Sequence, residues 1–122
     1  MRLGVLVFHL TRRRRMYLPD DSFASLVAFI EGFSAGTDQS LSGFQPWVAE
    51  RVLGHCSNRV WWTILIEAHP MFRDVPTPPV GRLPDEVGQD LVGRTIELLT
   101  AFATERGDPP PERLPAPGEI ST

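Results

Sequence analysis

Apolar residues recur at helical spacing in four segments of the chain, and the first of them spans residues 21–35. Its apolar residues follow one another at steps of three and four: Phe23, Leu26, Val27, Ile30 and Phe33. This spacing places them on one face of a helix. Asp20 or Asp21 stands where a carboxylate accepts the free N–H groups of the first turn. We expect Gly36 to end this helix.

A second helix is expected over residues 43–53. Its apolar stripe consists of Phe44, Trp47, Val48 and Val52, with Leu53 beside it. Proline has no N–H to donate, so Pro46 is tolerated only in the first turn. Gly54 stops the helix.

The third segment, residues 59–69, is almost continuously apolar. Val60, Trp61, Ile64, Leu65 and Ala68 recur on one side, and Trp62 and Ile66 widen the apolar face. We expect a helix capped by Asn58 and ended by Pro70, at the centre of the core. The run VWWTILI would also suit a buried strand.

A proline-rich crossing over residues 73–84 leads to the fourth and longest helix, expected over residues 85–106. Pro84 suits a helix start, and Asp85 and Glu86 complement the positive end of the helix dipole. The apolar residues of this segment keep helical spacing: Val87, Leu91, Val92, Ile96, Leu98, Leu99 and Phe102.

These four segments predict an all-α fold, a compact bundle of about four helices. The expected centre of the core consists of Phe23, Ile30, Trp47, Val52, Trp61, Ile64, Leu91, Leu98 and Phe102. Residues 107–122 hold five prolines and few apolar side chains, which is typical of a disordered proline-rich tail.

The first fifteen residues differ sharply from the rest, because an apolar run from Leu3 to Leu10 is followed by four arginines. They allow three interpretations: a strand with a basic loop, a basic arm for nucleic acid or anionic lipid, or an upstream extension to a chain that starts at Met16. We favour the last. The expected organisation is therefore a basic extension over 1–15, a helical domain over 16–106 and the tail over 107–122.

The charge of the chain is distributed unevenly. The net charge is −3, but from residue 16 onward seven Arg stand against 15 Asp and Glu, a balance of −8. An acidic surface repels phosphate backbones and suits a basic protein partner. All 12 basic residues are Arg, which we attribute to GC-rich coding of the actinobacterial type.

Cellular location follows from two simple features. The single cysteine, Cys56, has no second cysteine for an internal disulfide, which favours a reducing compartment such as the cytoplasm. The apolar run at the start is too short to cross a bilayer, and its positive charges follow it instead of preceding it as in a secretory signal. We expect no membrane association.

Candidate chemistry is confined to His55, Cys56, Glu67 and His69, four groups within fifteen residues. They lack the Cys-x-x-Cys and His-x-x-x-His spacings of zinc sites, and adjacent residues such as His55 and Cys56 rarely point at each other. We therefore assign no catalytic, metal or cofactor-binding residue and expect no cofactor. A small enzyme that uses this region remains the alternative.

Two surfaces are candidates for partner binding. Trp62, Ile66 and Glu67 lie where the wide apolar face of the third helix would reach solvent, and an exposed face of this kind predicts a protein partner or a homodimer. Arg12 to Arg15 could serve a nucleic-acid-binding regulator, but no aromatic residue interleaves the run and the rest of the domain is acidic.

The segments LVAFIEGF, LSGFQPWVAERVLG and VWWTILIEAHP, between residues 16 and 70, resemble small uncharacterised bacterial proteins of actinobacterial type. Some of these are similar to immunity proteins against polymorphic toxins. The resemblance implies a small, acidic, cytoplasmic and non-catalytic protein that binds and blocks a basic toxin domain. We therefore expect a non-catalytic protein-binding module.

Overall fold

The computed structural model describes residues 2–36 and 41–112, and every regular element within them is helical. This confirms the all-α class predicted from the sequence. The described residues form five α-helices: α1 (Leu3–Arg12), α2 (Phe23–Gly36), α3 (Phe44–Leu53), α4 (Trp61–Ala68) and α5 (Asp85–Glu105). Three short 3-10 turns join them: η1 (Arg14–Met16), η2 (Pro70–Phe72) and η3 (Val80–Arg82).

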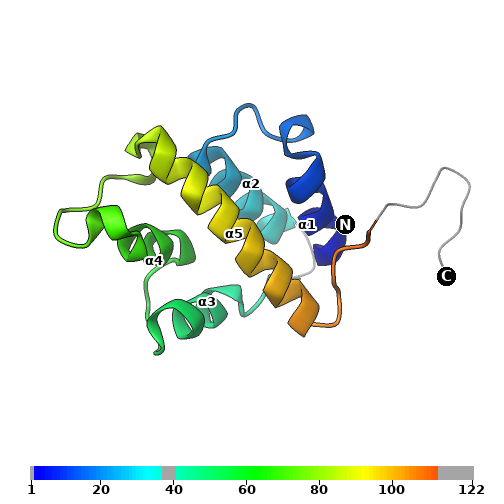
Figure 1. Ribbon diagram of the computed structural model, residues 1–122. Helices are drawn as coiled ribbons and strands as arrows, with labels where there is room; N and C mark the ends of the chain where they lie inside the picture. The colour runs from blue at the N-terminus through cyan, green and yellow to red at the C-terminus, as the bar shows by residue number, and fades with distance from the viewer. Residues whose placement is uncertain (1, 37–40, 113–122) are drawn as a thin grey trace, which may run out of the picture.

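Helix α5 organises the bundle. It lies across the molecule, with α1 and α2 on one side and α3 and α4 on the other (Figure 1). It packs against α1, α2 and α3, while α4 packs against α3. An apolar residue recurs about every turn along α5, so this helix has buried side chains along its full length: Val87, Leu91, Val92, Leu98, Leu99 and Phe102.

Four predicted helices match observed ones closely, and the third apolar segment is helix α4, not a strand. Seven of the nine residues expected at the centre of the core are buried; Trp47 and Val52 pack against it half-buried. The cap predicted at Asn58 is wrong, because Val60 occupies the N-cap of α4 and its side chain makes no capping hydrogen bond. Gly54 ends α3 in the left-handed conformation that glycine favours, with a φ of 78°.

The basic extension expected over residues 1–15 is instead largely a helix of the core. In α1, Leu3, Leu6, Val7 and Leu10 are spaced at three, one and three residues, so they share one face, and each is at most 2% exposed. They belong to the same apolar cluster as the other helices. Helix α1, which lies before the boundary expected at residue 16, therefore belongs to the same helical domain as the residues after it.

The tail predicted over residues 107–122 begins as an ordered segment. Gly107 adopts a left-handed φ of 76°, which turns the chain after α5. Asp108 then accepts a hydrogen bond from the Gly4 backbone N–H at 3.1 Å and pairs with Arg2 at 3.3 Å. Residues 113–122 of the predicted tail lie outside the described residues.

Candidate protein-binding cleft

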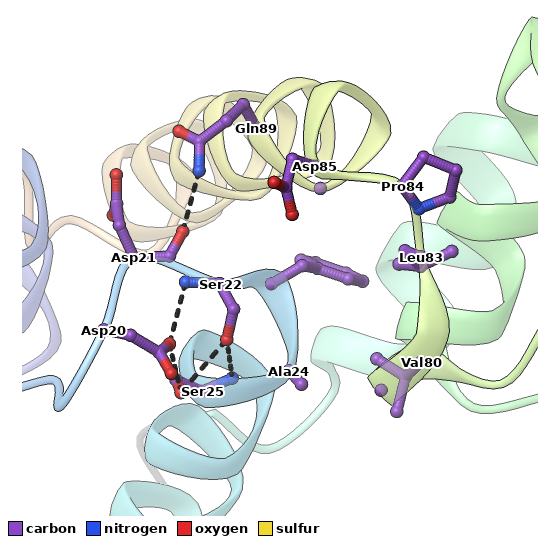
Figure 2. A pocket seen from close by; sticks show the side chains of 13 residues that line it. Asp20, Asp21, Ser22, Ala24, Ser25, Val80, Leu83, Pro84, Asp85 and Gln89 are labelled. Atoms are coloured by element: carbon purple, nitrogen blue, oxygen red, sulfur yellow. Dashed lines mark hydrogen bonds between the residues drawn. The ribbon is translucent and has the colours of Figure 1, made fainter.

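The N-terminal turn of α2 is held by a network of serine hydroxyls and one carboxylate. Ser22 Oγ accepts the Ser25 backbone N–H at 3.1 Å, and Asp20 Oδ1 accepts the Ser22 N–H at 2.9 Å and the Ser25 hydroxyl at 2.7 Å (Figure 2). Ser22 is therefore the N-cap of α2, a role that we had expected for Asp20 or Asp21, and the Asp20 carboxylate holds Ser22 and Ser25 in place. Hydrogen bonds from Ser22, which have the largest effect, and from Ser25 lower the pKa of Asp20. Its carboxylate is therefore ionised at neutral pH.

Asp21 is neutralised by an arginine of the preceding turn. Arg14 Nε donates to Asp21 Oδ1 at 2.5 Å and Arg14 Nη2 to Oδ2 at 3.3 Å, a two-pronged pair typical of guanidinium and carboxylate. The hydrogen bond from Arg14 lowers the pKa of Asp21. Gln89 of α5 donates to the Asp21 backbone carbonyl at 2.9 Å, so the start of α2 is tied to α5.

The segment that precedes α5 supplies the opposite wall of a cleft. Val80, Leu83 and Pro84 present apolar side chains, and Phe23, which is 2% exposed, lies beneath them. Figure 2 shows Val80, Leu83 and Pro84 across from Asp20 and Ser25. Asp85, the first residue of α5, lies at the rim, and within the described chain its carboxylate has no hydrogen bond or ion pair.

This α2–α5 cleft encloses about 640 Å³ between a polar and an apolar wall. Since Arg14 neutralises Asp21, the charges that face the cleft without a cationic partner are those of Asp20 and Asp85. An arginine or lysine side chain has the matching chemistry, because its aliphatic stem packs on apolar surface while its charged head reaches a carboxylate.

The four residues singled out for chemistry do not converge on one site. His55 Nδ1 contacts the Cys56 carbonyl at 2.8 Å, and the Cys56 thiol is exposed. Glu67 pairs with Arg59, whereas His69 pairs with Asp90 of α5 at 3.0 Å. Among the described residues, no three His, Cys, Asp or Glu side chains gather in a group that could hold a metal ion.

His69 is the most enclosed of these four residues, but both of its ring nitrogens are engaged. Nδ1 accepts the Met71 backbone N–H at 3.1 Å, so in the neutral imidazole the proton resides on Nε2. Nε2 is 3.0 Å from Asp90 Oδ2 and donates to it. Neither nitrogen is left to take a proton from a substrate, and His69 instead ties the end of α4 to α5.

The partner-binding surface predicted on α4 is not present as expected. Ile66 is only 4% exposed and belongs to the core, because α4 turns this side toward its neighbours. Trp62 is half-buried and packs edge-on against Trp61 at 5.5 Å. Of the three predicted contact residues, Glu67 is exposed, and it pairs with Arg59. The homodimer expected through Trp62 and Ile66 therefore loses its basis.

We did not predict the cleft from the sequence, although we had identified the two acidic pairs beside it, Asp20-Asp21 and Asp85-Glu86, as helix starts. The chain repeats one pattern, Pro-Asp followed by Asp or Glu, at residues 19–21 and 84–86. We interpreted each pair as serving its own helix. Only the packing of α2 against α5 brings the two helix starts together around one hollow.

The comparisons with known proteins leave the family open. No family model, no curated protein and no solved structure matches the chain. The resemblance to small bacterial immunity-type proteins therefore stays a prediction. Within the described residues, none of the helices combines the length and the apolar character that a membrane span requires.

Proposed function

We propose that this protein is a non-catalytic binding domain that takes a basic side chain of a protein partner into the α2–α5 cleft. The observation that carries the proposal is the arrangement of Asp20 across from Val80, Leu83 and Pro84, with Asp85 beside Pro84 at the rim (Figure 2). One wall offers charge and the other offers apolar contact, which is the combination that an arginine or lysine side chain needs.

The energetics favour such an anchor. The second oxygen of Asp20, Oδ2, accepts no hydrogen bond within the described chain, so it is free to accept one from an incoming guanidinium or ammonium group. Hydrogen bonds to charged groups are stronger than those between neutral groups, and arginine is a frequent anchor at the centre of interfaces. The chain as a whole carries a net charge of −3, which favours the approach of a basic partner.

We extend the proposal to an immunity-type inhibitor, a small acidic protein that binds and blocks a basic toxin-like domain. Support comes from the acidic balance of the chain, from its helical fold, and from the separate engagement of His55, Cys56, Glu67 and His69. The single cysteine favours a reducing compartment, and we propose that the protein acts in the cytoplasm.

The test is an affinity pull-down from the native host at low ionic strength, followed by measurement of the affinity for the retained protein. The cleft variant is Asp20→Asn/Asp85→Asn, which removes two charges and keeps side-chain size and the Asp20 acceptor oxygen. The control is Asp74→Asn/Glu86→Gln, since these two exposed carboxylates remove the same charge outside the cleft lining.

We expect wild type and control to retain the same basic protein, and the cleft variant to bind it at least about tenfold more weakly, a loss of about 1.4 kcal/mol. Circular dichroism confirms that all variants fold. Equal affinity of the cleft variant and wild type would remove the cleft from the interface and contradict the proposal.

A further inference from the structure

The turn after α1 carries the highest density of unpaired positive charge in the described chain. Arg12, Arg13 and Arg15 make no ion pair there, whereas Arg14 is committed to Asp21. Met16 follows at the tip of this basic turn, residues 12–16, and is 73% exposed. The Met16 side chain is therefore available for an apolar contact beside these arginines.

The basic turn and the α2–α5 cleft lie side by side. The Arg14–Asp21 pair joins them directly, and the end of α1, the loop to α2 and the start of α5 lie along one edge of the molecule (Figure 1). Arg14 and Arg15 therefore stand beside the acidic start of α2 at Asp21, whereas Arg12 and Arg13 lie over the ring of Phe8.

This balance argues against a polyanion as the ligand of the basic turn. The neighbouring carboxylates would repel the phosphates of a nucleic acid or of an anionic bilayer at the same distance at which the arginines attract them. A surface with a basic half and an acidic half is instead complementary to the same surface rotated by 180°. A two-fold axis then places the basic half of each copy on the acidic half of the other.

We propose that a second copy of this chain docks on this edge, so that the basic turn of each protomer enters the cleft of its partner. Arg15 would meet Asp20 and Asp85, and Met16 would pack on the apolar wall at Val80 and Leu83. The charge of Arg15 is complementary to the two carboxylates, and the apolar Met16 side chain is complementary to the apolar wall. The inference rests on the binding role proposed for the cleft, and it makes self-association compete with binding of another basic protein.

The test uses sedimentation velocity of the full chain at about 20 mM and about 500 mM salt, because screening weakens exposed charge pairs. We expect a reversible dimer at low salt, with a dissociation constant between about 10 µM and 1 mM, as for a small transient interface. Wild type that stays monomeric up to about 1 mM at low salt would overturn the inference.

Charge reversal identifies the surface. Arg15→Asp and Asp85→Arg alter exposed side chains that have no ion pair in the described chain, and each variant alone should weaken the dimer at least about tenfold. An equimolar mixture should restore it, since one contact then carries the original pair and the other the reversed pair. Arg73→Asp is the control, because this residue is exposed and does not line the cleft.

Three outcomes would overturn the inference: failure of the mixture to dimerise, a dimer that persists in both single variants, or Arg15-dependent binding of DNA or anionic vesicles by monomeric protein. The outcome is separable from the proposed function. A monomer that still binds a foreign basic protein through the cleft contradicts only the dimer. A dimer whose foreign partner ignores Asp20→Asn/Asp85→Asn contradicts only the proposed function.

Discussion

Gly4 and Asp108 meet across almost the whole length of the sequence: the Gly4 backbone N–H donates to Asp108 Oδ2 at 3.1 Å. The carboxylate lies at the N-terminal turn of α1, where unpaired N–H groups and the helix dipole favour negative charge. The segment that follows α5 thus caps the first helix. The two ends of the helical domain stabilise each other.

The close approach at Gly4 predicts that a methyl group there is costly. A Cβ atom would lie 2.5 Å from the backbone oxygens of Asp108 and Pro109, so the segment after α5 would have to move. We expect Gly4→Ala to lower the free energy of unfolding by about 1–3 kcal/mol, measured by urea denaturation. Gly32→Ala is the control, because nothing lies within 4 Å of that Cβ, and it should gain about 0.5–1 kcal/mol. Equal effects at both glycines would show that the contact is absent in solution.

The burial of α1 predicts that the domain depends on its first helix. Leu6 is 0% exposed, and Leu6→Ala should cost about 2–5 kcal/mol. Deleting residues 2–15 removes five buried apolar side chains, each contributing about 1.5–3 kcal/mol, out of a typical total stability of about 5–15 kcal/mol. We expect the shortened chain to lose cooperative thermal unfolding, whereas Arg15→Ala at the surface should change the stability little. A sharp unfolding transition of the shortened chain would contradict this.

The Arg14–Asp21 pair predicts a defined pH dependence. Because the pKa of Asp21 is lowered in the folded protein, the pair stabilises fully above the ordinary carboxyl value of about 4 and loses its effect as the pH falls below that value. Asp21→Asn should therefore lower stability at pH 7 by up to about 1 kcal/mol. Chemical denaturation at a series of pH values should show this difference shrinking below about pH 4. Asp74→Asn serves as control; a difference for Asp21→Asn that is independent of pH would exclude the charge as its cause.

The two neighbours Ile66 and Glu67 should respond in opposite ways to substitution. Ile66 is 4% exposed, so Ile66→Ala should leave a cavity and cost about 2–5 kcal/mol of stability. Glu67→Gln breaks an exposed pair with Arg59 and should cost less than about 1 kcal/mol. Thermal unfolding of both variants measures the contrast. A stable Ile66→Ala variant would return this residue to the surface and with it the partner face first expected on α4.

The sequence by itself determined the helical class and four helices within one or two residues at most ends, because local periodicity and helix-ending residues are properties of neighbours along the chain. Helix α1 carries the same signal at residues 3, 6, 7 and 10. We had interpreted this segment as a basic extension because four arginines follow it, and we gave its apolar spacing too little weight.

Only the tertiary structure decided which faces are covered and which helix ends meet. Ile66 is buried because neighbouring helices cover it, and periodicity alone does not say how wide a covered face is. The cleft exists because α2 and α5, whose first residues are Phe23 and Asp85, begin side by side. Such contacts join residues far apart in sequence, as Gly4 and Asp108 do, so no local pattern encodes them.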